Sequence, residues 1–551
     1  MKSGLLISAL LLTCWLVPAE ENHHETLTPA QLGMVHFPTS CAPAVRTSIE
    51  RGVALLHSFW YEEAEKQFTA IAKQDPNCAM AHWGVAMSLW HQLWNRPDRA
   101  TIEHGLAQLK QASALSATPR ERGYVSALEH FYDHPGGGYQ KRANAYCEAM
   151  GKVSRQNPSD HEAAAFYALS LLAAEPENDK HNRNRKTAAE VLEKLFALEP
   201  NHPGVAHYLI HTYDTPEMAQ QGLPAARRYA QIAPAAPHAL HMPSHIFARL
   251  GLWQEDIASN LASIQATRKE AAQHLGGEGH QFHAMDYLVY AYLQSGREQQ
   301  ARTVIEELRT MPAIDDMYNM GFDARLFALS TFTAGYELEL HHWREAAQLS
   351  PVPGAARRMR AATYAAQVIG SAHSRQAERA HQAFRELERM AAELSKDDRA
   401  AVRDVQEQMA SVRPWVEYAD GKSAQALKSL RRLALKDQAV SEISEGVPER
   451  EMLADLLLEL ARPEEALLEY QAELKINPGR FNSLYGAAQA AERAGKKEQA
   501  NAYYTQLVSN CDGARPERHE LEQARAAIEE HAGQGPQAGF EGHDGVPSPA
   551  K

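Results

Sequence analysis

Two stretches of this chain repeat each other at an offset of 34 residues. The copies share two prolines and two histidines, which align as Pro200 with Pro234, Pro203 with Pro237, His207 with His241, and His211 with His245. A fixed period of roughly 20–50 residues is the signature of repeat architectures, in which each unit packs only on its neighbours. The repeat therefore predicts a stack of helical units rather than one compact core.

Small residues, large apolar residues and prolines recur at the spacing of paired helices. In the unit that begins near Ala44, Gly52 and Ala64 precede Phe68 and Pro76. Small residues let two antiparallel helices approach closely, and larger ones fill the space between them. Proline ends the second helix because it has no amide to donate. The pattern returns at Ala188, Leu192 and Pro200, at Ala225, Tyr229 and Pro237, at Gly296 and Ala301, at Ala466, Tyr470 and Pro478, and at Ala500 and Tyr504. No segment alternates with period two between hairpin turns, so we expect an all-α fold without a sheet.

From residue 44 to about 510 the chain resembles the tetratricopeptide-repeat (TPR) class. Four sequence segments also resemble a group of exported bacterial TPR proteins of unsettled function. These segments are HFPTSC, DPNCAMAHWGVAMS, HAMDYLVYAYLQ and RFNSLYGAAQAAERAG. The resemblance implies an α-solenoid, a superhelix whose first helices line a concave groove. Members of the class usually bind a peptide or protein partner in that groove, and the resemblance implies no particular activity.

The N-terminus has the features of a signal peptide. Lys2 provides a positive flank, residues 4–17 are apolar, and the small-residue site at 17–19 precedes Glu20. We therefore expect an exported protein, periplasmic or secreted from a bacterium, and a short buried helix is the alternative. We divide the chain into a signal peptide at 1–19, an irregular segment at 20–43, a TPR array with a histidine-lined groove at 44–310, less regular helical repeats at 311–450, a C-terminal TPR pair and helix at 451–532, and a disordered tail rich in Gly, Pro and Gln at 533–551.

Several classes of partner are excluded by composition and motif. The net charge of −13 is spread along the chain, so nucleic acid is not an expected partner. No later stretch reaches about 18 consecutive apolar residues, so no transmembrane span is expected. Thr13 is a poor residue before Cys14 in a lipoprotein box, and we expect no lipid anchor. The glycines at 133–139 follow no strand and precede no Gly-Lys-Ser, so no nucleotide cofactor is expected.

Two cysteines are placed to form a disulfide. Cys41 lies just before the first repeat, and Cys78 lies at the turn into the second. Adjacent repeats are neighbours in a solenoid, so the pair can come within the Cα separation of about 4.4–6.8 Å that a bridge requires. Two separate buried thiols are the alternative. The chain has no CxxC pair, which excludes a thiolate zinc site.

In the TPR class, positions 2, 5, 9, 12 and 13 of each repeat usually face the groove. The resemblance places histidines at these positions in successive repeats: His207 and His211 at 5 and 9, then His238, His241 and His245 at 2, 5 and 9, then His283, Asp286 and Tyr290 at 2, 5 and 9. The corresponding stripe of the N-terminal repeats contains Trp83, Met87, Trp90 and His91. We expect a groove that is aromatic at one end and rich in imidazole in the middle.

The histidine repeat predicts a metal centre. Residues four apart share one face of a helix, and packed helices lie about 8–10 Å apart, so imidazoles from neighbours can converge on one ion at about 2.0–2.1 Å. We expect His207, His211, His241 and His245 to bind one divalent transition metal, such as Zn, Cu or Fe. His238, His283 and Asp286 would surround this centre or form a second one. Packed histidines without a ligand role are the alternative.

Three functions fit these features. The first is an exported TPR scaffold that binds a ligand or protein partner in its groove, with a histidine-bound metal. The second is a metal-dependent enzyme, hydrolytic or oxidative, in which Tyr208, Tyr213, Asp214 and Tyr290 act as acid–base or hydrogen-bonding neighbours. The third is a metal-free interaction scaffold of the cell envelope, whose histidines hold a peptide carboxylate.

Overall fold

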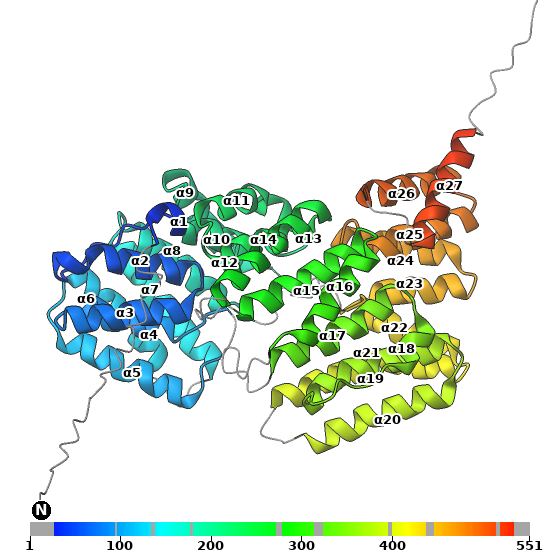
Figure 1. The fold of residues 1–551 in the computed structure, drawn as a ribbon, viewed down its shortest axis with the longest axis horizontal. Coiled ribbons are helices and arrows are strands. Elements are labelled where there is room, and N and C mark those ends of the chain that lie inside the picture. The colour runs from blue at the N-terminus through cyan, green and yellow to red at the C-terminus, as the bar shows by residue number, and fades with distance from the viewer. Residues whose placement is uncertain are drawn as a thin grey trace, which may run out of the picture.

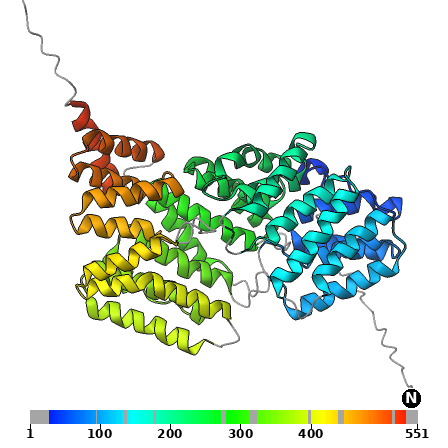
Figure 2. The ribbon, with the colours of Figure 1, turned by 180° about the vertical axis from the view of Figure 1, so that it is seen from behind.

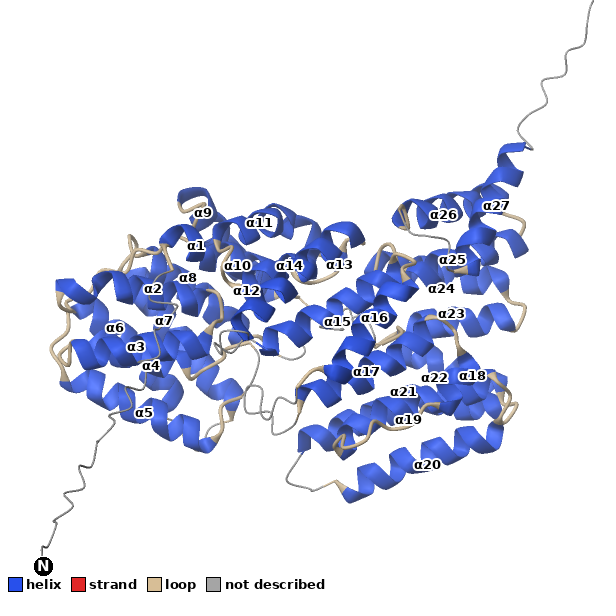
Figure 3. Ribbon diagram, viewed as in Figure 1, coloured by secondary structure: helices blue, strands red, loops and turns tan. Residues whose placement is uncertain are grey.

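The computed structural model describes residues 27–93, 96–133, 138–176, 179, 181–271, 278–312, 323–394, 399–436, 446–513 and 518–533. The predicted signal peptide lies outside these residues, as does the predicted tail beyond Gly533. Among the described residues every regular element is a helix (Figure 3), which confirms the all-α fold. None of the described helices has both the length and the apolar character that a bilayer span needs.

The helices follow one another with short connections. The N-terminal part contains α1 (Pro29–Leu32), the 3-10 turn η2 (Pro43–Val45), α2 (Arg46–His57), α3 (Tyr61–Gln74), α4 (Ala79–Ser88), α5 (Arg99–Ala114), α6 (Pro119–Tyr132), α7 (Tyr139–Gln156), α8 (His161–Ala173), α9 (Arg183–Leu198), α10 (Pro203–Tyr213), α11 (Ala219–Ile232), α12 (Pro237–His241), α13 (Pro243–Arg249), α14 (Trp253–Ala271), α15 (Glu278–Gln294) and α16 (Glu298–Thr310). The C-terminal part contains α17 (Ala324–Glu339), α18 (Trp343–Gln348), α19 (Arg357–His373), α20 (Ala377–Glu393), α21 (Arg399–Ala419), α22 (Ser423–Ala434), α23 (Glu449–Glu459), α24 (Pro463–Ile476), α25 (Phe481–Arg493), α26 (Lys497–Asn510) and α27 (His519–Gly533).

Consecutive helices pack on each other, and this arrangement makes the chain a solenoid. Contacts run from α2 to α3, from α3 to α4 and onward in the same sequential manner to α26 and α27. Figure 1 shows α1–α9 at one end of the molecule, α10–α16 in the middle and α17–α27 at the other end, and Figure 2 shows the same order from behind. The repeats at 311–450 follow this pattern, with α18 shorter than its neighbours.

Glycines set the close approach of paired helices, as the sequence pattern predicted. A Cβ atom at Gly84 would lie 2.2 Å from the ring of Phe68, and one at Gly52 would lie 2.7 Å from the same ring. In the C-terminal pair a Cβ atom at Gly486 would lie 2.3 Å from the ring of Tyr470. At each of these positions an aromatic side chain occupies the space that a larger residue would need.

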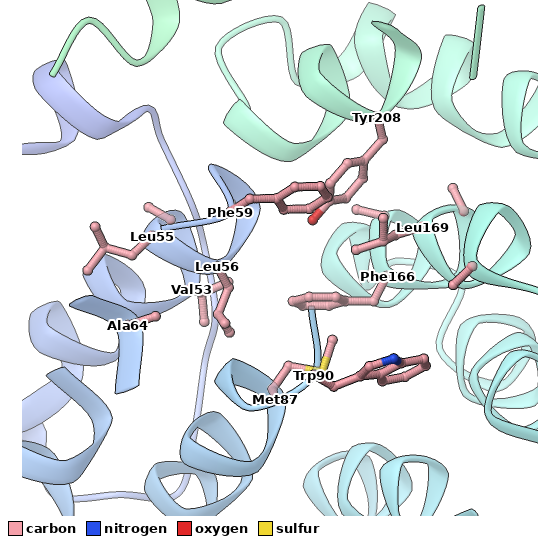
Figure 4. Close-up of a cluster of buried hydrophobic side chains, with 14 of the residues drawn as sticks. Val53, Leu55, Leu56, Phe59, Ala64, Met87, Trp90, Phe166, Leu169 and Tyr208 are labelled. Atoms are coloured by element: carbon pink, nitrogen blue, oxygen red, sulfur yellow. The ribbon is translucent and has the colours of Figure 1, made fainter. Parts of the chain in front are cut away.

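The predicted aromatic stripe of the N-terminal repeats does not line an open groove. The side chains of Trp83, Met87 and Trp90 are buried in the hydrophobic core. Phe166 of α8 lies close to Met87 and Trp90 (Figure 4). Its ring centroid lies 5.6 Å from that of Trp83. An aromatic side chain of α8 therefore packs against Trp83 of α4. We correct the expected binding surface accordingly: these residues are core.

The N-terminal segment crosses several repeats before the first helix pair begins. The amide of Met34 donates to the carbonyl of Asn201 at 3.1 Å, and the amide of Ala235 donates to the carbonyl of Gln31 at 3.1 Å. Its described part is largely irregular, with α1 as a single turn. This segment therefore contacts the chain just before α10 and between α11 and α12.

A disulfide joins the end of this segment to the first repeat. Cys41 and Cys78 are bonded, with their Cα atoms 4.7 Å apart. Cys147 and Cys511 are free and buried. The bond links the segment that crosses α10 to the turn between α3 and α4.

Candidate metal centre

The histidine repeat occupies four helices of the array, α10, α12, α13 and α15. His207 and His211 lie one turn apart on α10, which begins at Pro203. His238 and His241 lie on α12, and the chain continues through Met242 into α13, which carries His245. The last member, His283, lies on α15. The contacts of α12 and α13 with α15, and of α10 with α13, bring the three sets of imidazoles together.

Three imidazoles converge in what we call the first triad: His207, His211 and His238. The Nε2 atom of His207 lies 3.1 Å from Nε2 of His211 and 3.1 Å from Nε2 of His238. One nitrogen from each ring lies within 4.8 Å of the other two. His207 and His238 are buried and His211 is half-buried.

A second triad consists of His241, His245 and His283. The Nε2 atoms of His241 and His245 lie 3.1 Å apart. The ring centroid of His283 lies 4.4 Å from that of His241 and 5.4 Å from that of His245. One nitrogen from each of these rings also lies within 4.8 Å of the others. His283 is the half-buried member.

This grouping corrects the predicted four-histidine centre. Each triad takes positions 5 and 9 of one repeat together with position 2 of the next, so the second triad repeats the first. The four predicted ligands are therefore divided between two centres, and His238 and His283 are full members. Asp286 lies almost one turn after His283 on α15 and belongs to neither triad.

The two triads lie directly beside each other. The ring centroids of His211 and His245 are 6.1 Å apart, and those of His238 and His241 are 6.0 Å apart. Rings within the first triad are separated by 4.8–6.3 Å. Ions held by the two triads would therefore be close neighbours.

The spacing of the nitrogens fits coordination of a metal ion. For two nitrogens 3.1 Å apart, an ion at about 2.0–2.1 Å from each would make an N–metal–N angle of about 100°, near the tetrahedral value. Three protein ligands leave at least one position open, as in catalytic rather than structural sites. The arrangement suits zinc, copper or iron, for which imidazole is a ligand.

Three of the six imidazoles donate their other N–H group to an oxygen atom. Nδ1 of His207 lies 2.6 Å from the carbonyl oxygen of His57. The Nδ1 atom of His241 lies 2.7 Å from Oδ1 of Asn260, and that of His245 lies 2.9 Å from Oδ2 of Asp214. Such partners fix the tautomer and orientation of metal-binding histidines, because the proton on Nδ1 leaves the lone pair on Nε2.

The orientation of the Asn260 amide is itself fixed. Its Nδ2 donates to the backbone oxygen of Asp256 at 3.1 Å and to the Asp256 carboxyl at 2.6 Å. Oδ1 therefore faces His241 as an acceptor. Asp214 is held as an anion, because Arg249 and His245 outweigh the effect of burial and keep its pKa well below the usual value.

Five of the six imidazoles have lowered pKa values and are neutral at physiological pH. Burial lowers the pKa of His207 to about 3 and that of His283 to about 3. Electrostatic repulsion from neighbouring imidazoles lowers both pKa values further. Burial also lowers the pKa values of His211, His238 and His241 well below 6.5. Neutral imidazole is the form that binds a metal ion.

A buried hydrogen-bonded group of His57, Glu162, His202 and Tyr208 contacts the first triad through the carbonyl of His57. Glu162 accepts from Nε2 of His57 at 2.7 Å and from Nε2 of His202 at 2.9 Å. The hydroxyl of Tyr208 lies 2.8 Å from Nδ1 of His57. His202 also accepts from the amide of Val205 at the start of α10. Every ring nitrogen of this group has a protein partner, which is typical of a structural network that positions the His57 carbonyl.

The remaining predicted site residues have other places in the fold. Tyr208 and Tyr290 are buried, and the Tyr290 hydroxyl accepts from Arg480 at 3.1 Å. The ring of His91 stacks on Tyr61 with centroids 4.5 Å apart. The Tyr213 hydroxyl donates to Glu193. The three tyrosines are buried, His91 packs against Tyr61 in the N-terminal repeats, and none of these four residues belongs to either triad.

Sequence reasoning missed several neighbours of the triads. His280, one turn before His283, has its ring 5.1 Å from that of His238. Tyr287 places its hydroxyl 3.1 Å from Nδ1 of His245. His280 could have been found from its place one turn before His283 on the same helix. The partners Asp256 and Arg249 carry no signal in the sequence pattern.

No protein-family model matches this chain, and no curated protein matches its sequence. Solved structures match over most of the chain at low identity. The human IFIT1 dimer with m7Gppp-AAAA is 13% identical, with 83% of this chain and 95% of that chain covered and a TM-score of 0.33. The P58(IPK) TPR domain is 12% identical, with 89% and 99% covered and a TM-score of 0.19. Yeast Tom70 is 10% identical, with 88% and 96% covered and a TM-score of 0.31.

The helix pairs, their glycine contacts and their sequential packing define this chain as a TPR-like α-solenoid. Its distinguishing feature is a buried group of six histidines, arranged as two triads that repeat each other.

Proposed function

We propose that the chain is an exported TPR-like protein that binds two transition-metal ions, one in each histidine triad. The solenoid is the scaffold that holds the ligands, since each triad combines histidines from different helices of the array. The N-terminal apolar segment supports export. The Cys41–Cys78 disulfide supports an oxidising compartment, because structural disulfides are rare in the cytosol.

One observation carries the metal assignment: the facing Nε2 atoms of His241 and His245. Both rings hold their proton on Nδ1, which donates to Asn260 in one case and to Asp214 in the other. Two bare lone pairs then face each other at 3.1 Å in a buried site. That contact is repulsive unless a cation lies between them. A bound ion satisfies both nitrogens at once, because neutral imidazole is the form that binds a metal ion.

A metal-dependent enzyme is the second candidate. The observation that favours it is the open coordination position at each triad, together with the half-buried His211 and His283 that bring each centre toward the surface. An ion with an open position can activate water for hydrolysis or take part in an oxidation. A metal-free interaction scaffold is the third candidate function. Its peptide would bind outside the predicted aromatic groove, because the residues expected to line that groove are buried.

Elemental analysis of the protein purified without a histidine tag tests the proposal. We expect two transition-metal ions per chain after reconstitution with zinc or copper and removal of loosely bound metal. The variants His211→Ala and His283→Ala should each retain about one ion, because each removes a ligand from one triad. His381→Ala is the matched control, since His381 pairs with Asp420 on the surface of α20. A chain that retains no ion would contradict the proposal.

A further inference from the structure

The two triads are near enough to act as one unit. The closest rings across the boundary, those of His238 and His241, have centroids 6.0 Å apart, while rings inside the second triad are separated by as much as 5.4 Å. Each triad has three nitrogen ligands and an open position. A small diatomic molecule can therefore reach both ions at once.

The ligand sets contain no anion among the described residues. All six members are imidazoles, which bind a metal ion in their neutral form and bring no negative charge. The ionised carboxylate that accepts from His245, that of Asp214, is paired with Arg249 at 2.8 Å, so its charge is already balanced. Two divalent ions would place four positive charges in this buried site, and uncompensated charge is costly to bury. Two monovalent ions would place only two positive charges there.

Copper meets this condition better than the other metals that imidazole binds. Imidazole is a ligand for copper, and Cu(I) is monovalent, whereas non-haem iron sites usually add a carboxylate. Zinc has no monovalent state under these conditions and no redox chemistry. Copper(II) also heads the affinity order for nitrogen sites.

From this geometry and charge we propose that the triads hold a copper pair that binds one dioxygen molecule between the two ions. The inference rests on the proposed function and names the ligand of that site. Each Cu(I) gives one electron to dioxygen, the O–O bond order falls from two to one, and no proton is taken up. The product is two Cu(II) ions bridged by a dianion. The total charge of the site is the same before and after binding, so the buried ligands need not compensate a new charge.

The test uses the full chain loaded anaerobically with two equivalents of Cu(I) and then exposed to dioxygen. We expect uptake of one dioxygen per two coppers, and a new charge-transfer band in the near ultraviolet. The oxidised protein should give little or no electron paramagnetic resonance signal, because the two Cu(II) spins couple through the bridge. These readouts require no knowledge of an organic substrate.

Two variants make the result specific. His283→Ala leaves the first triad intact, and it should bind one copper that gives a full Cu(II) signal after oxidation, with no stoichiometric dioxygen uptake. His211→Ala should behave in the same way through the second triad. His381→Ala should match the parent chain in copper content, dioxygen uptake and the silent signal.

The outcomes separate this inference from the proposed function. If the chain holds two coppers that both give independent Cu(II) signals, the shared dioxygen site does not exist while the metal assignment stands. If the chain holds zinc tightly but no copper, the inference is also wrong and the assignment again stands. If no ion is retained at either triad, both the dioxygen inference and the metal assignment are wrong.

Discussion

The guanidinium of Arg480 and the carboxylate of Glu451 form a two-point ion pair that is completely buried. Nη2 donates to Oε1 at 2.7 Å and Nε donates to Oε2 at 2.9 Å. Arg480 also donates to Glu339 at 2.8 Å and to the hydroxyl of Tyr290 at 3.1 Å. Tyr290 lies on α15, the helix that carries His283. The ion pair therefore links the C-terminal repeats to the helix that completes the second triad.

Replacement of Arg480 should destabilise the protein strongly. In Arg480→Met the carboxylates of Glu451 and Glu339 would remain buried without their cation, which typically costs about 3–5 kcal/mol. We expect a matching fall in the free energy of unfolding, measured by urea denaturation followed by circular dichroism. Arg309→Met is the control, because Arg309 is half exposed and pairs only with Glu306 at the surface. A loss below about 1 kcal/mol, the range of surface pairs, would show that the buried pair contributes little.

The sequence predicted the helical repeats and every histidine of the triads, because both depend on spacing within and between successive units. It could not predict the grouping into two triads. The choice of partner for position 2, filled by His238 and His283, depends on how neighbouring helices cross. The burial of Trp83 likewise depends on a tertiary contact, that of its ring with Phe166 of α8. The contact of Tyr290 with Arg480 joins residues far apart in sequence, and no repeat pattern signals it.

The stability of the metal-free protein should fall with pH below about 6.5. The pKa of His207 and that of His283 are about 3 in the folded chain, against 6.5 when unperturbed. Between these values the unfolded chain binds protons that the folded chain does not, so acid favours unfolding. The contribution is fully present above pH 6.5 and is lost as pH falls toward 3. Each such histidine adds up to about 1.4 kcal/mol per pH unit in this window.

Thermal unfolding of chelator-treated protein, measured at intervals from pH 8 to pH 4, checks this pH dependence. The variant His283→Gln has one titrating group fewer and should show a shallower slope than the parent chain. His381→Gln changes an exposed histidine and should keep the parental slope. Equal slopes in the parent and His283→Gln would mean that His283 titrates normally in the folded chain.

Loss of the disulfide should destabilise the N-terminal repeats. Cys41 and Cys78 are 37 residues apart in sequence, and closing a loop of this size is worth roughly 4 kcal/mol in the chain-entropy treatment. The double variant Cys41→Ser, Cys78→Ser should therefore unfold at a lower urea concentration than the oxidised parent. The parent chain in reductant should show a similar decrease in its urea midpoint. Mass spectrometry under non-reducing conditions should find the two cysteines linked in one peptide pair, with Cys147 alkylated after denaturation. Two free thiols in protein from an oxidising compartment would contradict the bond.

The amide of Asn260 should control metal affinity at the second triad without touching the ion. Its Oδ1 holds the proton of His241 on Nδ1, and Asn260→Leu removes this acceptor, so the ring is free to carry its proton on Nε2. Loss of such a partner typically lowers metal affinity about 10- to 100-fold. We expect this fall for one of the two ions in a competition titration with a chelator, and no change for the other. Ser263→Ala is the matched control on the same helix, because Ser263 is equally buried but donates to the carbonyl of Pro237. If both ions weaken equally in Asn260→Leu, or if Ser263→Ala has the same effect, the amide acts through the packing of α14 and not through the tautomer of His241.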